Sequence, residues 1–116
     1  MTPSDLDRSL LTLLSAHAGR ANPISRLDLC AALSRYRLSE RQIREQIRLL
    51  RRAGHLIGSA PGEDGGYYLI TTLEEFNEFM QSEYLAKIKD MSETAHAMTR
   101  AANRVWGSAA LQTRMF

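Results

Sequence analysis

The chain has 116 residues, 44% of them hydrophobic and 24% charged, proportions typical of a compact globular domain that folds without metal ions or disulfides. Its single cysteine, Cys30, has no second cysteine with which to form a disulfide or a cysteine-based zinc site, and such sparse cysteine usage is typical of a reducing cytoplasm. Charges at Asp5, Asp7 and Arg8 argue against a signal peptide or a membrane span, so we expect a soluble cytoplasmic protein.

The formal net charge of +2 averages over segments of opposite sign. Residues 35–60 contain seven arginines and two glutamates, whereas residues 61–93 contain eight acidic residues and two lysines. Residues 94–116 contain three arginines and no acidic residue. This asymmetry predicts a basic surface formed by the middle of the chain, next to an acidic segment.

Residue pairs with the spacing of helix capping boxes mark four expected helix starts. They are Ser4 with Asp7, Ser25 with Asp28, Ser39 with Gln42, and Thr72 with Glu75. The apolar spacing that follows predicts helices over about 5–18, from 25 onward, over 39–54 and over 73–106. Between the first two helices, Pro23 favours an extended backbone, and we expect a very short strand around Ile24.

Two runs with strand character, residues 55–60 and 67–71, are joined by the turn-rich sequence PGEDGG and predict a β-hairpin. Successive side chains of a strand point to opposite faces, so we expect one of Tyr67 and Tyr68 to pack inward and the other to be exposed. Glu63 and Asp64 occupy the turn and would repel phosphates at close range. We therefore do not expect the turn to contact DNA.

The segment ISRLDLCAALSRYRLSERQIREQIRLLRRAGHLIGSAPGEDGGYYL resembles the winged helix-turn-helix domains of bacterial and phage regulators, including the N-terminal DNA-binding domain of the biotin repressor type. The resemblance covers Leu10 to Leu69. It implies a winged helix-turn-helix domain, and the uninterrupted residues 73–106 predict a long C-terminal helix after it. The expected fold is therefore mainly α with a small β-hairpin (α+β). We expect the domain to span residues 1–72, the long helix 73–106 and a flexible tail 107–116.

The helix expected over 39–54 carries its five arginines on one arc, opposite Ile43, Ile47 and Leu50. In helix-turn-helix docking the second helix enters the major groove, and its first residues reach the base edges. Arginine can contact guanine, glutamine can contact adenine, and later arginines contact phosphates. The expected DNA-binding residues are Ser39, Arg41, Gln42, Arg44, Glu45, Arg48, Arg51 and Arg52. The alternative is a solvated face whose charges pair within the helix, for example Glu45 with Arg48.

The helix expected over 73–106 contains apolar or small residues spaced by four and three positions over three heptads, the pattern of a coiled-coil seam. These expected dimerisation residues are Tyr84, Ile88, Met91, Ala95, Met98, Ala102 and Val105. A homodimer through this helix would place two recognition helices on one duplex. The alternatives are pairing with a helix of another protein, or folding back onto the same chain.

The three histidines, His17, His55 and His96, lie on separate elements with no metal-ligand spacing, and no serine, cysteine or acid pair has an activating neighbour. We expect no enzyme activity, cofactor, metal or small-molecule ligand. The interpretation is sequence-specific binding of double-stranded DNA by a small bacterial or phage transcriptional regulator acting as a dimer. The alternatives are a protein–protein interaction module, a replication or recombination accessory, and an architectural DNA binder without strong base readout.

Overall fold

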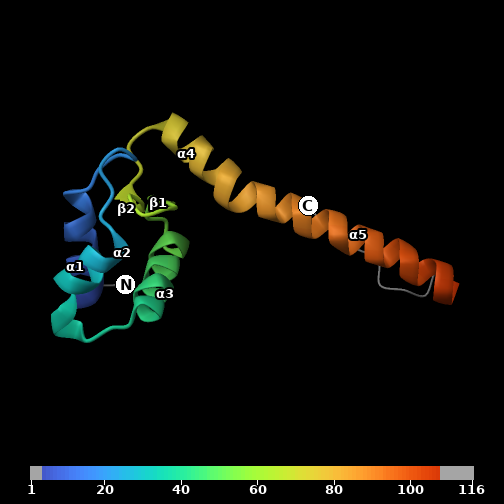
Figure 1. Cartoon of the computed structure of the whole chain (residues 1–116), viewed down its shortest axis with the longest axis horizontal. Helices are drawn as coiled ribbons and strands as arrows, with labels where there is room; N and C mark the ends of the chain where they lie inside the picture. Colours follow the sequence, from blue (N-terminus) through green and yellow to red (C-terminus); the bar gives the residue numbers. More distant parts are fainter. Residues whose placement is uncertain (1–3, 108–116) are drawn as a thin grey trace. The chain divides into compact units, whose positions relative to one another are not determined.

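A computed structural model describes residues 4–107 of the chain (Figure 1). These residues are mainly α-helical, with a two-stranded antiparallel hairpin and a long C-terminal helix, as the sequence predicts. The elements are α1 (Asp5–Ser15), α2 (Arg26–Ala32), the short 3₁₀ helix η1 (Ser34–Tyr36), α3 (Glu40–Arg52), β1 (Ile57–Ala60), β2 (Gly66–Leu69), α4 (Leu73–Met80), the π-helical segment η2 (Gln81–Leu85) and α5 (Ala86–Trp106). The predicted tail, apart from Gly107, lies outside the described residues.

The chain divides into two compact units, Met1–Asn77 and Glu78–Phe116. In the first unit the predicted caps are present: the hydroxyl of Ser4 accepts the backbone N–H of Asp7 at 3.1 Å, and that of Ser25 accepts the N–H of Asp28 at 3.0 Å. Each cap satisfies a backbone donor that the first helical turn leaves without a partner.

Helix α1 ends at Ser15, three residues before the end predicted at residue 18. The chain leaves the helix because the residues around Ala18 pair with Leu69 as a parallel bridge. The N–H of Leu69 donates to the carbonyl of His17 at 3.0 Å, and the N–H of Gly19 donates to the carbonyl of Leu69 at 2.8 Å. A long-range pairing therefore sets this boundary.

Strands β1 and β2 form the predicted hairpin, in the register Ile57 with Leu69 and Ala60 with Gly66. The expected strand at Ile24 is confirmed as an antiparallel bridge to Tyr67, with N–H to carbonyl distances of 2.8 and 2.9 Å. A Cβ at Gly66 would lie 1.9 Å from the carbonyl oxygen of Ile24, so this pairing requires glycine there. The connection between α1 and α2 thus lies along the free edge of β2.

The expectation that one of Tyr67 and Tyr68 would be exposed is wrong: both are buried, at 6% and 1% exposure. Tyr67 belongs to the core, whereas Tyr68 points to the other face of the hairpin. There its ring lies against Gly58, the residue opposite it in the register, where a Cβ would be only 2.4 Å from the ring. The glycine makes room for the ring on this second face of the hairpin, and both tyrosines are therefore buried.

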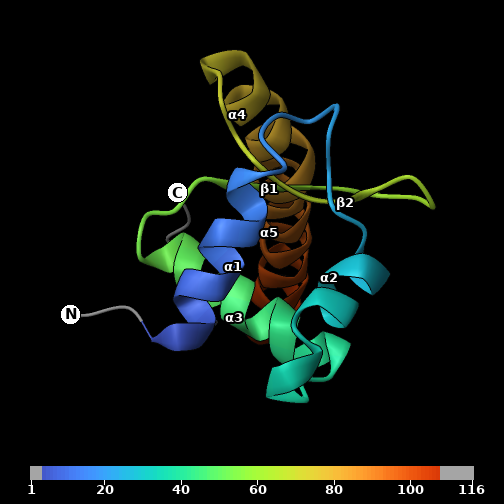
Figure 2. The same ribbon diagram turned by 90° about the vertical axis from the view of Figure 1, so that its left-hand side faces the viewer.

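The core of the first unit lies between α1, α2, α3 and the hairpin, with the three helices gathered below the strands in Figure 2. The predicted inward face of α3, Ile43, Ile47 and Leu50, is buried at 2%, 1% and 5% exposure. Burying a side chain of this size stabilises the fold by about 1.5–3 kcal/mol. The other buried residues of the core cluster are Leu10, Leu14, Ile24, Leu29, Leu33, Ile57 and Tyr67.

Every residue from Leu73 to Trp106 is helical, which matches the predicted bounds. The sequence did not indicate the π-helical segment η2, because no glycine or proline interrupts the helix there. A π segment places residues five positions apart near each other, and the rings of Phe79 and Tyr84 meet edge to face with centroids 5.6 Å apart. The residue that follows the helix, Gly107, has a φ of 76°, a conformation that glycine adopts readily.

Glu75 joins two loops of the first unit. Its carboxylate accepts the backbone N–H of Arg20 at 2.9 Å, the N–H of Thr71 at 2.9 Å and the hydroxyl of Thr71 at 3.0 Å. These bonds favour the ionised form, and the bond from Arg20 contributes most to lowering the pKa of Glu75. The charged side chain therefore ties the loop after α1 to the residues after β2.

We predict that Glu75→Gln lowers the thermal midpoint at pH 7, because an amide N–H would face one of these donors. A carboxylate whose pKa is lowered by folding stabilises the protein above its unfolded pKa, and this contribution is lost as the pH falls through the folded value. The difference from the wild type should therefore shrink as the pH drops below the ordinary value of 4.5. Melting curves from pH 7 to 3 measure it. Glu74→Gln is the neighbouring control, and a difference that is independent of pH would contradict the prediction.

Candidate nucleic-acid interface

The start of α3 is held by a complete capping box. The hydroxyl of Ser39 accepts the N–H of Gln42 at 3.2 Å, and the side-chain oxygen of Gln42 accepts the N–H of Ser39 at 2.8 Å. Both residues were predicted to bind DNA. A bidentate contact to adenine needs the oxygen and the nitrogen of the glutamine amide, and the cap already uses the oxygen. With the cap intact, a contact from Gln42 to a base would use its amide N–H groups and the one remaining lone pair of that oxygen.

Three arginines of α3, namely Arg41, Arg44 and Arg52, are exposed. Among residues 4–107, no hydrogen bond or ion pair joins any of the three to another side chain. They lie on the arc opposite the buried residues of α3, as the spacing predicts. We call this set of three the arginine face.

Arg48 lies on the same arc, but its guanidinium is bound to Glu45. Its Nε donates to one carboxylate oxygen of Glu45 at 3.0 Å, and Nη2 donates to the other. This pairing is the main reason that the pKa of Glu45 is lowered and that of Arg48 is raised, and the charges of Arg41 and Arg52 lower the pKa of Glu45 further. Glu45 and Arg48 therefore form the ion pair within the helix that is expected if α3 presents a solvated face.

Arg51 makes a structural contact that the sequence does not predict. It is half-buried, and its Nε donates to the backbone carbonyl of Ile57 at 2.8 Å. The bond ties the last turn of α3 to the start of β1. On the helical wheel Arg51 is the arginine of α3 nearest the core face. This position is the feature of the sequence that indicates a contact within the protein and not with phosphate.

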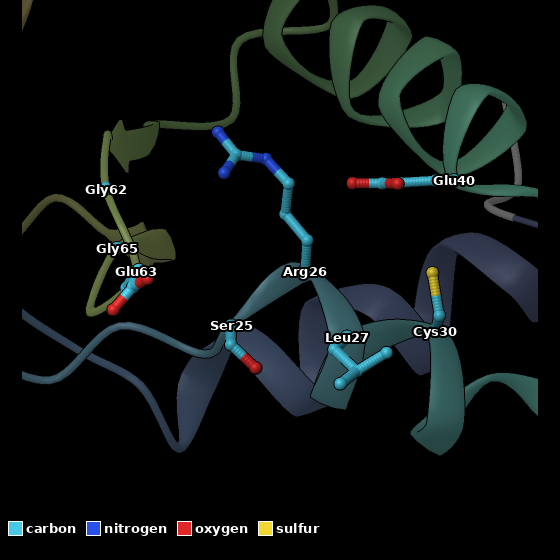
Figure 3. Close-up of a pocket in the computed structure, with 8 residues that line it drawn as sticks. All are labelled: Ser25, Arg26, Leu27, Cys30, Glu40, Gly62, Glu63 and Gly65. Atoms are coloured by element: carbon cyan, nitrogen blue, oxygen red, sulfur yellow. The ribbon is translucent and has the colours of Figure 1, made fainter.

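One arginine outside α3, Arg26 of α2, lies near the start of α3. Figure 3 shows its side chain extending from α2 into the space between the β1–β2 turn and Glu40, with Glu63 on the turn. These residues line an open pocket of about 310 Å³. The guanidinium carbon lies 5.9 Å from the centre of the Tyr67 ring, a distance at which a cation is attracted to an aromatic face. The sequence pattern does not single out Arg26, because no basic neighbours accompany it along the chain.

The second unit presents its predicted seam to solvent. Ile88 is 39% exposed, Met91 68%, Met98 69% and Val105 70%. Ala95 and Ala102 are partly exposed, and no residue of α5 is buried. Tyr84, at the start of the seam, packs its ring edge to face against the ring of Phe79.

Two more large apolar residues are also exposed: Leu85, the last residue of η2, at 43%, and Trp106 of α5, at 73%. At about 100° per residue they fall beside the seam, within about 60° of Ile88. The apolar surface that runs from the end of η2 along α5 is therefore wider than the predicted seam.

Within the described part of the chain, no three histidine, cysteine, aspartate or glutamate side chains are grouped so that they could hold a metal ion. None of the helices in residues 4–107 is both long enough and apolar enough to cross a membrane. No protein-family model, no curated protein and no solved structure matches this chain.

We predict that Arg51→Ala lowers the free energy of unfolding by about 1–3 kcal/mol, because the carbonyl of Ile57 loses a charge-assisted hydrogen bond. Arg52→Ala, which removes the same charge from the neighbouring exposed position, should change stability by less than about 0.5 kcal/mol. Urea unfolding of both variants measures the difference. Equal stability of the two would show that the bond to Ile57 contributes nothing.

Proposed function

We propose that the protein binds double-stranded DNA with α3 as the reading helix and acts as a small transcriptional regulator of the bacterial or phage type. The observation that carries the proposal is the arginine face. Among the described residues none of its three arginines forms an ion pair, and the Glu45 carboxylate, which interacts with the charges of Arg41 and Arg52, is bound to Arg48, so the face can attract an anionic ligand. The forked guanidinium suits both phosphate and guanine.

The positions along α3 suggest different contacts. Arg41 and Arg44 lie in the first turns, the part of a recognition helix that reaches base edges. Arg52, at the C-terminal end, fits a phosphate contact better. Arg48 has two options: it can leave Glu45 when DNA binds, or remain paired as a neutral part of the surface.

Arg26 supplies the phosphate contact that the hairpin turn does not offer. Glu63 and Asp64 are exposed on the turn, and their charges oppose a phosphate backbone nearby. The side chain of Arg26 extends between this turn and α3 (Figure 3). On this proposal, α3 and Arg26 make the contacts, and the acidic turn limits how the duplex can lie.

Selection from a random duplex library at several salt concentrations tests the proposal. Enrichment of a motif is the expected result. If the protein binds DNA without enriching a motif, and rising salt weakens this binding steeply, it is an architectural DNA binder instead. Phosphate contacts release counterions but do not read sequence. No binding even at low salt would leave an acidic protein surface as the ligand of the arginine face.

We predict that Arg44→Ala weakens binding to the selected site by about 1–3 kcal/mol and relaxes the preference at one base position. Arg100→Ala is the charge-matched control, since it removes one arginine from α5 and leaves α3 unchanged. Fluorescence anisotropy on the selected duplex and on single-base variants of it measures both effects. Equal losses from the two substitutions would mean that only overall charge matters.

We propose further that the protein acts as a homodimer through the exposed apolar stripe of α5. An amphipathic helix of 21 residues with no buried side chain exposes apolar surface that a second helix can cover. Two copies would also give two reading helices for one symmetric site.

We predict that Ala95→Glu, in the middle of the seam, converts the dimer into a monomer, because it would place a charge between the two helices. Ala97→Glu introduces the same side chain two residues away, on the opposite arc, and should leave the dimer intact. Sedimentation equilibrium at tens of micromolar distinguishes the two. A wild-type chain that is monomeric in the same experiment would contradict the proposed dimer.

A further inference from the structure

The apolar stripe of α5 alternates small and large residues in a way that distinguishes two dimer arrangements. Numbered as heptads, its a positions are Ile88, Ala95 and Ala102, and its d positions are Met91, Met98 and Val105. All six lie in the regular α-helical part after η2, so their spacing is not disturbed by the π segment. From Met91 to Ala102 the stripe alternates methionine and alanine.

A parallel, in-register dimer would place each residue opposite its own copy. Two methionines would face each other at positions 91 and 98, and two alanines at positions 95 and 102. The distance between packed helices depends on the side chains at the contact. Helices held apart by the methionine pairs would leave voids at the alanine pairs, and such voids are destabilising.

An antiparallel dimer removes this mismatch, because a positions then face d positions. In the register centred between His96 and Ala97, Met91 faces Ala102 of the partner subunit, and Ala95 faces Met98 of the partner subunit. At the ends, Ile88 faces Val105 of the partner subunit. Each layer between the ends combines one large and one small residue, the condition for even packing along the seam. We infer that the protein self-associates through an antiparallel pair of α5 helices in this register.

The same register accounts for the two exposed apolar residues outside the seam. The positions that flank one side of an antiparallel seam pair with each other, and here Leu85 faces Trp106 of the partner subunit. Next to them, Ser92 faces Thr99 of the partner subunit, a small polar pair at the edge. Leu85 and Trp106 are 43% and 73% exposed in the single chain. The antiparallel arrangement gives each of them a partner of its own kind.

The distribution of charge along the helix also favours the antiparallel arrangement. Residues 83–93 contain three acids and two lysines, a net charge of −1, whereas residues 94–107 contain Arg100 and Arg104, a net charge of +2. Antiparallel pairing places the negative half beside the positive half of the partner, and parallel pairing places the four arginines at one end. Antiparallel helix dipoles also attract each other.

Cysteine cross-linking tests the arrangement with the full-length chain. Ile88→Cys and Val105→Cys are made separately in a Cys30→Ser background, then purified, mixed to exchange subunits and oxidised. The antiparallel pair brings position 88 of one chain to position 105 of the other, so a disulfide-linked heterodimer should form in the mixture. Each variant alone should remain uncross-linked, because identical cysteines would be about 26 Å apart along the axis, at 1.5 Å per residue.

Glu93→Cys and Arg100→Cys are the matched control. They occupy opposed positions in the same register but lie on the polar arc, so their mixture should not cross-link. Met91→Cys mixed with Ala102→Cys repeats the test at a second layer, in case one substitution prevents folding. Sedimentation equilibrium on each reduced variant shows whether it dimerises.

The inference rests on the proposed dimer and is independent of DNA binding. Cross-linking of each single variant with itself would establish a parallel dimer and overturn the inference alone. A dimer in which neither mixed pair cross-links overturns it as well. A monomeric wild-type chain would overturn the dimer and the antiparallel arrangement together, and anisotropy with the selected duplex reports separately on DNA binding.

Discussion

The first unit depends on the pairing of Ile24 with Tyr67 along the free edge of β2. Two short hydrogen bonds at this bridge, and two more around Leu69, attach the connection between α1 and α2 to the hairpin. The pairing is possible because Gly66 has no side chain where the carbonyl of Ile24 approaches. Ser25, the cap of α2, follows directly, so the bridge fixes where α2 begins. The place of α3, which packs on α2 and β1, follows from the same anchor.

Helix α3 separates structural and exposed side chains by angle. Ile43, Ile47 and Leu50 fill the core, and Arg51 at the margin bonds to the backbone of β1. The arginine face has none of these contacts, so substitutions there can change binding with little effect on folding. Glu45 moderates the face, since its pairing with Arg48 removes one positive charge from the side that would meet DNA. The helix therefore offers fewer available cations than its sequence suggests.

Local sequence predicted the elements that depend on local interactions. The cap residues Ser4, Ser25 and Ser39 begin helices as expected, and the spacing of α3 identified its buried face. The failures involve contacts between distant residues: α1 ends early because Leu69 pairs beyond it, and Tyr68 is buried where Gly58 makes room. Arg51 likewise finds its acceptor in another element. Part of the candidate site, the exposure of Arg41, Arg44 and Arg52, follows from periodicity, whereas the pairing of Arg48 depends on which of several possible partners Glu45 selects.

On the proposed function, dimerisation through the apolar stripe of α5 would increase the affinity with which the arginine face binds DNA. The proposal gives each subunit few contacts to DNA, with Arg41 and Arg44 on the bases and Arg52 and Arg26 on phosphates, and each phosphate contact would weaken as salt rises. Two such surfaces joined through α5 would bind one duplex with a high effective concentration for the second contact, so a modest affinity per subunit can yield tight binding without further contacts. This gain exists only if the geometry lets both subunits engage the same duplex. An antiparallel helix pair joins the two N-terminal units to opposite ends of the pair, so the length of α5 would enter directly into the spacing of the DNA half-sites.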